Sequence, residues 1–472
     1  MKNYKSLIAN HAQTANSFLD VTDKWSGEVM AKVAYADEAM IEQALAKAHA
    51  CEKRLAHVSH GRREAWLREL YKRLEVRAPE FTSIISKEAG KPIAYAKAEV
   101  DRCLVTLKIA AEEARRLVGE KVSVDFGAGA GKSAFTDRFP IGTVLGISPF
   151  NFPLNLALHK LAPAIASGCP IILKPSPLAP ASLFAFAELL EGLDMPEGAV
   201  SILMCTHEQA AKLSMDSRIK LISFTGSPSV GWAIKAKAGK KRVLLELGGN
   251  APVIVDESAE LSDAAKKIAV GAFLYAGQIC ISTQRVFVHK NIFSEFQKKL
   301  LEETAKLVTG DPANEKSQVG PMISKEHFHR VKAWVDEAIA ADATVLCGAK
   351  VVDEKHNLYA PTWLTNVPTD QKVSCQEVFG PVAILESVSD FDQAILQAND
   401  TAFGLQAGVF TNRLDHMKQA YRDLEYAGVM INNIPGFRVD SMPYGGIKDS
   451  GFGREGLRYA IEEFTESKLL VF

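Results

Sequence analysis

From Thr143 onward, short apolar runs alternate with segments of helical periodicity, and no other feature of the sequence constrains the fold as much. Strands and helices that alternate in this way build a parallel sheet with helices on both faces. Ligands of such sheets bind beyond the carboxyl ends of the strands. The sequence therefore predicts an α/β fold with functional residues directly after the strands. The expected strands are 143–148, 170–174, 200–204, 221–225 and 243–247, with helices such as 178–190 and 229–238 between them.

A second alternating region follows at about residues 251–434. It contains expected helices at 261–275 and 390–398 and expected strands near 286–289 and 408–411, which is typical of a second α/β domain. The first 120 residues are expected to be mostly helical. Helices are predicted at 37–54, 62–76 and 93–118, and another is opened by Pro79 and closed by Gly90.

Residues 120–138 fit neither domain, because they alternate on both sides of a glycine-rich stretch at 127–131 and so indicate a β-hairpin. The segment 464–472 ends in an apolar run, and a hairpin paired with this terminal strand is expected to contact another subunit in a homodimer or homotetramer. The stretch 127–133 also resembles a nucleotide-binding P-loop. It is one residue short and no good helix follows, so a hairpin turn is the better interpretation.

Length and composition exclude several other classes of function. A chain of 472 residues predicts two or three domains, and its formal net charge of −1 favours neither nucleic acid nor a membrane surface. The first residues lack the pattern of a signal peptide, and the uncharged region 139–158 contains prolines unsuited to a lipid-facing helix, so a cytoplasmic protein is expected. Seven scattered cysteines without a C-x-x-C pair predict neither a disulfide framework nor a metal site.

Cys280 is the cysteine whose surroundings suggest reactivity, since it follows Gly277 in a turn after the helix expected at 261–275. Backbone N–H groups at such a turn can lower the pKa of a thiol. A buried, inert thiol is the alternative on this residue alone. Glu246 ends an expected strand and precedes two glycines, so it could act as a general base beside a ligand. A solvated or ion-paired carboxylate is the alternative.

Three further strand ends carry polar groups that suit ligand binding. Asn151, in the run PFNFP, could stabilise an oxyanion or simply form the turn. Lys174 could bind the ribose or phosphate of a cofactor, or lie on the surface. Ser227 and Pro228 suit the start of a helix whose N-terminus would attract a pyrophosphate, although the Rossmann glycine fingerprint is absent.

Together these motifs resemble the aldehyde dehydrogenase superfamily. The runs PFNFP, LKPS, FTGS, LELGGN, GQIC, EVFGP and PYGGIK occur in the order typical of that family, and the resemblance extends from residue 88 to residue 451. It implies oxidation of an aldehyde to a carboxylic acid with NAD(P)⁺. It also implies a Rossmann-like cofactor domain at 1–119 and 139–245, an α/β catalytic domain at 246–442, and a small β-hairpin oligomerisation element at 120–138 and 459–472.

The resemblance assigns roles by motif position. Cys280 would be the nucleophile, Asn151 would form the oxyanion hole with the Cys280 backbone N–H, and Glu246 would be the general base. Lys174 is assigned both a catalytic and a cofactor-binding role. Lys174 and Glu377 would each hold a ribose of the cofactor. The implied cofactor contacts are Ile147, Ser148, Pro149, Phe150, Lys174, Ser176, Pro177, Gly226, Ser227, Gly231, Leu247, Glu377 and Phe379.

Two departures from the family pattern bear on cofactor and substrate. Pro177 stands where many NAD-using members carry a glutamate that would repel a 2′-phosphate, so we expect NAD with tolerance of NADP. The stretch 433–444 resembles members that act on lactaldehyde, glyceraldehyde phosphate and phosphonoacetaldehyde. Within it, Arg438, together with Arg102, could bind a short anionic or hydroxylated aldehyde. Alternatively, either arginine could pair with an acid such as Asp101 or Asp440.

Three rival functions are weighed against this one. A broad aliphatic aldehyde dehydrogenase would leave both arginines structural. A CoA-acylating dehydrogenase would generally lack the base at the Glu246 position, and a non-catalytic family member would have lost Cys280, Asn151 or Glu246, which are all present. His159, on an expected helix, is interpreted as a packed rather than a catalytic histidine.

Overall fold

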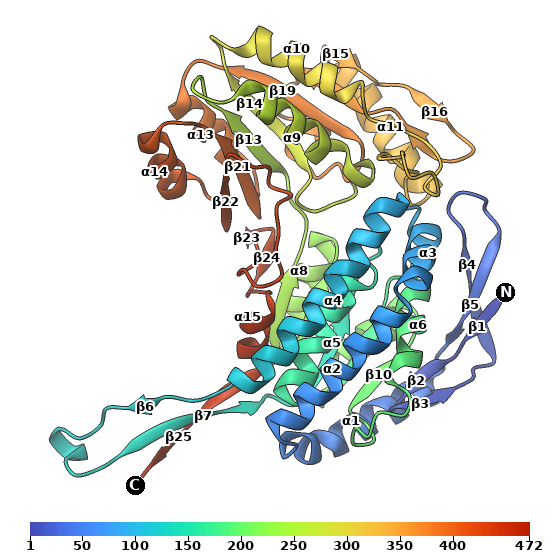
Figure 1. The fold of residues 1–472 in the computed structure, drawn as a ribbon, viewed down its shortest axis with the longest axis vertical. Coiled ribbons are helices and arrows are strands. Elements are labelled where there is room, and N and C mark those ends of the chain that lie inside the picture. Colours follow the sequence, from blue (N-terminus) through green and yellow to red (C-terminus); the bar gives the residue numbers. More distant parts are fainter.

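A computed structural model describes the whole chain, residues 1–472. It consists of two α/β lobes and a long β arm that projects from one of them (Figure 1). The sheet of the first lobe comprises β2 (Ser6–Ile8), β3 (His11–Gln13), β8 (Thr143–Ile147), β9 (Ile171–Lys174), β10 (Val200–Ile202), β11 (Ile219–Thr225), β12 (Arg242–Glu246) and β24 (Gly451–Phe452).

The first sheet has the strand order β24-β12-β11-β8-β9-β10-β2-β3. Its five central strands are parallel, as the strand–helix alternation predicts, and each lies within two residues of its expected start. Because the strands run in one direction, their carboxyl ends meet at one edge. The helices of this lobe are α1 (Glu38–Ala56), α2 (His60–Val76), α3 (Ala78–Ala89), α4 (Ile93–Arg116), α5 (Asn155–Ser167), α6 (Ala181–Leu190), α7 (His207–Met215) and α8 (Pro228–Lys237).

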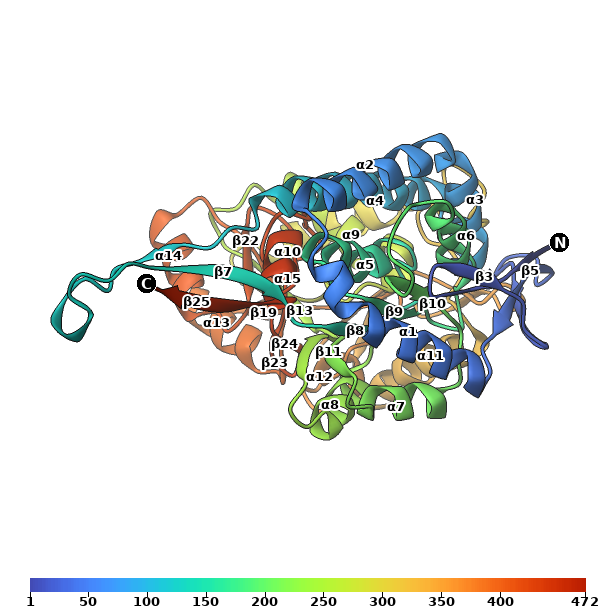
Figure 2. The same cartoon turned by 90° about the horizontal axis from the view of Figure 1, so that it is seen from below.

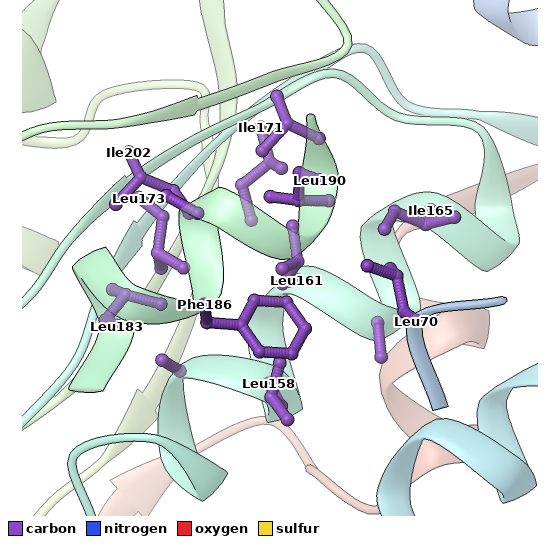
Figure 3. Packing of buried hydrophobic residues seen from close by; sticks show 14 of the residues in the cluster. Leu70, Leu158, Leu161, Ile165, Ile171, Leu173, Leu183, Phe186, Leu190 and Ile202 are labelled. Carbon is purple, nitrogen blue, oxygen red and sulfur yellow. The ribbon is translucent and has the colours of Figure 1, made fainter. Parts of the chain in front are cut away.

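Helix α5 is buried along its entire length, since it lies between the sheet and the layer formed by α2 and α4. A helix that is apolar on all sides fits this position. Figure 3 shows Leu158 and Leu161 of α5 packed beside Phe186 of α6 and Leu173 of β9. Each such fully buried side chain stabilises the fold by roughly 1.5–3 kcal/mol. This core fixes α5, and with it the loop that precedes α5 and carries Asn151.

The expectation of a mostly helical N-terminal region is wrong for the first 35 residues. They form β1 (Lys2–Tyr4), β2, β3, β4 (Ser17–Thr22) and β5 (Val29–Tyr35), and β1, β5 and β4 make a separate three-stranded sheet. Strands β1, β2 and β3 have three residues each, which is too short for a readable periodicity, so their pattern is weak. The four helices predicted after residue 37 are all present, and Gly90 ends α3 in the left-handed conformation, with φ 62°.

The second lobe contains the other α/β unit, with the strand order β15-β18-β19-β14-β13-β21-β22. Its strands are β13 (Ala251–Val255), β14 (Thr283–His289), β15 (Thr344–Cys347), β18 (Thr362–Thr365), β19 (Val382–Val388), β21 (Gln406–Phe410) and β22 (Gly428–Ile431). Its helices are α9 (Leu261–Phe273), α10 (Phe293–Thr304), α11 (Lys325–Ala340), α12 (Lys372–Cys375), α13 (Phe391–Asn399) and α14 (Leu414–Asp423). Two small two-stranded sheets join β16 (Val351–Asp353) to β17 (Leu358–Tyr359) and β20 (Phe403–Gly404) to β23 (Ile447–Lys448).

After the second lobe the chain returns to the first. Strand β24 pairs with β12, and α15 (Leu457–Glu463) packs against α5 through Leu457 and Ile461. The segment after β22 therefore reaches the first sheet beside Glu246, the last residue of β12. This return brings Tyr444 and Glu455 close to the carboxyl ends of the parallel strands.

The projecting arm consists of β6 (Lys121–Val122), β7 (Ala134–Pro140) and β25 (Thr465–Val471) (Figures 1 and 2). Strand β25 pairs antiparallel with β7 from Thr465 opposite Pro140 to Val471 opposite Ala134, which confirms the predicted hairpin and terminal strand. The glycine-rich stretch is a short 3₁₀ turn followed by β7 and not by a helix, so it is no P-loop. In the whole chain, no helix combines the length and the apolar character needed to cross a membrane.

Candidate active site

The carboxyl ends of β8, β9, β11 and β12 open onto one cleft of about 660 Å³, which also receives residues of the second lobe. Asn151, Glu246 and Cys280 all line it. Three segments far apart in the sequence thus place an amide, a carboxyl and a thiol around a single space. The expected cofactor contacts that line the same cleft are Ile147, Ser148, Pro149, Phe150, Lys174, Ser176, Pro177, Gly226, Ser227, Leu247, Glu377 and Phe379.

Gly231 is the one expected cofactor contact that does not line the cleft. A Cβ atom at this position would lie 2.4 Å from Cδ2 of Leu247, so the glycine allows α8 to pack closely against the residue that follows β12. Gly231 thus has a packing role in the structure, and its contact with a cofactor stays a prediction.

Cys280 lies in a tight loop after α9. Tyr275 and Ala276 both adopt left-handed backbone conformations, with φ 50° and 53°, and Gly277 has φ 68°. Such conformations in non-glycine residues are costly and are concentrated at functional sites. The Cys280 Sγ lies 3.1 Å from the Tyr444 hydroxyl oxygen. Burial raises the pKa of the Cys280 thiol to about 11, in contrast to the lowering expected from an exposed turn.

Asn151 is buried in the loop before α5 and faces the Cys280 loop. Its Nδ2 donates a hydrogen bond to the carbonyl of Gln278 at 3.0 Å, while its Oδ1 accepts one from the Phe152 N–H at 3.1 Å. The side chain thus forms the turn and also points its N–H donors toward the thiol loop. The turn-forming interpretation of Asn151 is thus confirmed, whereas its role at an oxyanion stays a prediction.

Glu246 is the last residue of β12 and is buried in the cleft wall. Its Oε2 has no hydrogen-bond partner, which is rare for a buried carboxyl oxygen. Burial and the neighbouring Glu455 raise the pKa of Glu246 well above its ordinary value. A carboxyl group with a perturbed pKa and an unpaired oxygen in a cleft is suited to take up a proton from a ligand or water.

The expected cofactor contacts form the other part of the cleft. Lys174 is buried, and its Nζ donates to the carbonyl of Pro175 at 3.2 Å. Glu377 accepts a hydrogen bond from the Gly249 N–H at 2.9 Å, and burial raises the pKa of Glu377 to about 7. No side chain caps α8 at Ser227, so the N–H groups of its first turn are available to an anion.

Arg102 and Arg438 do not line this cleft. Arg102 Nη2 lies 2.7 Å from the carboxylate of Asp440, which is the acid pairing that the sequence left open. Arg438 is buried, its Nη2 lies 2.9 Å from Nδ1 of His159, and it lies 3.6 Å from Glu455. His159 in turn lies 2.9 Å from Asp440, so it is a packed histidine inside a buried charged cluster.

This charged cluster nevertheless reaches the thiol. The guanidinium of Arg438 lies over the ring of Tyr444, 3.5 Å from its centroid, and the Tyr444 hydroxyl contacts Cys280. The Nε of Arg438 is buried without a hydrogen-bond partner. Burial alone would raise the pKa of Asp440, but His159 and Arg102 hold it well below its usual range. A fixed cation therefore lies one aromatic ring away from the candidate nucleophile.

Comparison with known proteins identifies this arrangement. Residues 11–470 match the model of the Aldehyde dehydrogenase family. The chain belongs to this family. The 3-sulfolactaldehyde dehydrogenase of Priestia megaterium is 40% identical over 473 residues, a match that covers 100% of this chain and 98% of that protein. A lactaldehyde dehydrogenase of Methanococcus maripaludis is 36% identical over 458 residues, which cover 96% of this chain and 97% of the relative.

Solved structures of aldehyde dehydrogenases share the complete fold. Aldehyde dehydrogenase 21 of Physcomitrella patens, crystallised with its reaction product succinate, superposes with a TM-score of 0.97 at 39% identity and covers 100% of this chain and 98% of its own. The glyceraldehyde-3-phosphate dehydrogenase GapN of Methanocaldococcus jannaschii, complexed with NADP, gives 0.92 at 35% identity and covers 97% and 99%. This chain is accordingly an NAD(P)-dependent aldehyde dehydrogenase with Rossmann-like and catalytic domains.

The structure of this aldehyde dehydrogenase also adds cleft residues that sequence reasoning missed. His327 and Arg330 extend from α11 of the second lobe, where His327 packs edge-on against Phe150 with ring centroids 5.8 Å apart. His207, at the start of α7, lines the cleft as well. In the sequence, these residues are polar positions on ordinary amphipathic helices. The meeting of the two lobes brings His327 and Arg330 to the cleft, and the packing of α7 in the first lobe brings His207 there.

Proposed function

We propose that this aldehyde dehydrogenase oxidises a short anionic or hydroxylated aldehyde to its carboxylic acid through a thioester on Cys280. The observation that carries the proposal is the convergence of Cys280, Asn151 and Glu246 on one cleft. The three groups are, in chemical type, a nucleophile, an oxyanion donor and a base. The presence of Glu246 favours water over CoA as the acyl acceptor.

In the proposed first half-reaction, the Cys280 thiol gives its proton to solvent water and the sulfur attacks the aldehyde carbon. The electron pair of the carbonyl moves to its oxygen, which the Asn151 side-chain amide and the Cys280 backbone N–H stabilise. Bound NAD(P)⁺ supplies the hydride acceptor, which side chains cannot provide. In the second half-reaction, Glu246 takes a proton from the water that attacks the thioester, and the Cys280 sulfur leaves.

The groups along the cleft suit a dinucleotide. Lys174 is a buried cation with only a backbone carbonyl as partner, and the uncapped first turn of α8 offers N–H donors to a pyrophosphate. A Cβ at Gly248 would lie 2.4 Å from Oε2 of Glu377, so the glycine leaves space for this carboxyl at the cleft wall. We infer that Lys174 and Glu377 hold the two riboses. NAD and NADP are both accepted in this account, because Pro177 presents no charge to a 2′-phosphate.

Two arginines support the proposed substrate class, although neither lines the cleft. Arg438 is a buried cation with an unpaired Nε, and Arg102 keeps 29% of its side chain exposed, so each retains donors for an anionic group. Relatives that act on 3-sulfolactaldehyde and that hold succinate as product process small molecules with a charged end. A sulfonate or carboxylate at the far end of the aldehyde would therefore bind near Arg438.

The proposal predicts a selective loss when the arginines are changed. Initial rates of cofactor reduction would be measured with NAD and with NADP on lactaldehyde, glycolaldehyde, phosphonoacetaldehyde, glyceraldehyde 3-phosphate, sulfolactaldehyde, succinic semialdehyde and a plain aliphatic aldehyde. Arg102→Ala should lower kcat/KM for the preferred anionic aldehyde by about 10- to 100-fold, because it removes a hydrogen bond to a charged group, and should spare the aliphatic aldehyde. Arg438→Ala should lower both rates, with the larger loss on the anionic aldehyde, because Arg438 also lies over the Tyr444 ring that contacts the Cys280 thiol.

Arg458→Ala is the matched control, since Arg458 is an exposed arginine that pairs with Glu462 on α15. It should leave all rates unchanged. A wild-type preference for the aliphatic aldehyde, or equal losses on charged and uncharged aldehydes, would contradict the anion site. Both arginines would then be structural, and a broad aliphatic aldehyde dehydrogenase would be the better account.

We further propose that the β arm joins subunits into a homodimer or homotetramer. Leu469, Leu470 and Phe472 on β25 and beyond it are more than half exposed in the single chain, and the arm extends away from both lobes (Figure 2). Leu470→Lys should shift the molecular mass measured by light scattering to a smaller species. Leu396→Lys, at a 71% exposed leucine on α13, is the control and should not. An unchanged mass in Leu470→Lys would contradict the arm's role.

A cytoplasmic location stays a prediction.

A further inference from the structure

We propose that the Tyr444 hydroxyl donates a hydrogen bond to the Cys280 sulfur and thereby stabilises the thiolate that attacks the aldehyde. The inference rests on the proposed nucleophilic role of Cys280. Its basis is the 3.1 Å distance between the hydroxyl oxygen and Sγ, across 164 residues of sequence. The Tyr444 hydroxyl has no other hydrogen-bond partner in the protein, so its proton is available to the Cys280 sulfur.

The backbone around Tyr444 holds the ring in place. The Tyr444 N–H donates to the carbonyl of Glu455 at 3.0 Å, and the Glu455 N–H donates back to Tyr444 at 2.6 Å. The next residue, Gly445, has φ 155°, and a Cβ at Gly446 would lie 2.3 Å from the carbonyl carbon of Ser450. The PYGGIK run therefore has two glycines where the chain folds tightly behind the tyrosine. A ring fixed in this way presents its hydroxyl to the sulfur without rearrangement.

The Arg438 guanidinium covers one face of the same ring at 3.5 Å from its centroid. A cation over an aromatic face withdraws electron density from the ring, which makes the phenol a better hydrogen-bond donor. Arg438 is itself held by His159 and Glu455, so the three-part stack of guanidinium, phenol and thiol is continuous. A phenylalanine at this position could stack with Arg438 but could not donate a hydrogen bond to the Cys280 sulfur.

The direction of the hydrogen bond follows from the two protonation states. Burial and the neighbouring Cys280 raise the pKa of Tyr444 well above its ordinary value, so the phenol keeps its proton in the neutral range. A thiolate has no proton to give, and the phenol must then be the donor. The charged groups that act on the sulfur are Glu377 and Glu246, which disfavour the thiolate, and Arg438, which favours it.

The hydrogen bond from Tyr444 counteracts the effect of burial on the Cys280 thiol. Burial raises the pKa of the Cys280 thiol to about 11, and the hydrogen bond with Tyr444 lowers it. The same donor serves again when the sulfur leaves the thioester, because negative charge returns to Sγ in that step. The hydroxyl hydrogen stays on the phenol oxygen throughout. Tyr444 is thus a catalytic residue that stabilises charge and transfers no proton.

The test compares Tyr444→Phe with the wild-type enzyme. The rate of iodoacetamide alkylation would be followed by mass spectrometry on the peptide that contains Cys280, from pH 6 to pH 11, without substrate. Loss of a hydrogen bond to a charged sulfur should raise the pKa of the thiol by about one unit, which lowers the alkylation rate at neutral pH roughly tenfold. The acid limb of kcat/KM against pH should move upward by the same amount.

Tyr426→Phe is the matched control, because Tyr426 is a buried tyrosine of the second lobe, outside the cleft, whose hydroxyl donates to the carbonyl of Ala398 at 2.5 Å and not to sulfur. Its Cys280 alkylation profile should equal the wild-type profile, and melting temperatures would verify that both variants fold. An unchanged profile in Tyr444→Phe overturns this inference alone. Full activity in Cys280→Ala would instead overturn the proposed function, so the two failures are separable.

Discussion

Cys280→Ala should lower steady-state aldehyde oxidation by about 10⁴-fold or more, because it removes the atom that forms the covalent intermediate. Neither Asn151 nor Glu246 can replace the sulfur, because an amide is not a nucleophile and a carboxylate is a much weaker nucleophile toward an aldehyde than a thiolate. Cofactor reduction would be followed by absorbance with saturating aldehyde. Cofactor affinity should be retained, since many residues other than Cys280 line the cleft.

Cys375→Ala is the matched control for this change. Cys375 is the exposed cysteine of the seven and does not line the cleft, so its loss should leave activity unchanged. If Cys280→Ala retained activity within about tenfold of the wild type, a role as nucleophile would be untenable, because removal of an essential nucleophile costs orders of magnitude more. Oxidation would then have to proceed without a covalent step.

Glu246→Gln should separate the two half-reactions. The first turnover should still release one reduced cofactor per active site, whereas steady-state turnover should fall by about 10²- to 10⁴-fold, the usual contribution of a general base. Glutamine has nearly the shape of glutamate and can occupy the same buried position at the end of β12, but its amide cannot take a proton from water. Rapid-mixing absorbance would measure the burst and the slow phase together.

The pH dependence of thioester hydrolysis gives a second test of Glu246, because the rate should change in one direction only. Because burial and Glu455 raise the pKa of Glu246, the carboxylate fraction increases as pH rises through that pKa. Thioester hydrolysis in the wild type should therefore accelerate with pH, and Glu246→Gln should lack this rise. Glu257→Gln, at a half-exposed residue outside the cleft, is the control. Full steady-state turnover in Glu246→Gln would refute the role of the base.

Much of the fold could be predicted because the parallel strands are mostly buried and lie between helices in the sequence. The β8 to β12 run has continuous apolar segments that end at polar residues, and the functional groups at those ends, Asn151, Lys174 and Glu246, do line one cleft. The hairpin could be predicted equally well, because side chains that alternate between apolar and polar on both sides of a glycine-rich turn fit strands and do not fit a helix. These signals are local and do not depend on contacts between distant segments.

What could not be predicted depends on such distant contacts. Arg102 and Asp440 are 338 residues apart, and their pairing becomes visible only when the chain returns to the first lobe after β22. His327 reaches the cleft because α11 faces the other lobe, which its own periodicity does not reveal. The Tyr444 contact with Cys280 has the same origin. The N-terminal strands were not predicted for the opposite reason: β1, β2 and β3 have only three residues each, so their local pattern is too weak.

The central claim, a thioester on Cys280, is tested most directly by trapping it in Glu246→Gln. The variant would be mixed with aldehyde and NAD⁺, quenched in acid after the burst, and measured by intact-protein and peptide mass spectrometry. The account predicts a single adduct, on the peptide that contains Cys280, with the mass of the aldehyde less two hydrogen atoms. A full burst of reduced cofactor with unmodified protein, or with the adduct on another cysteine, would contradict it.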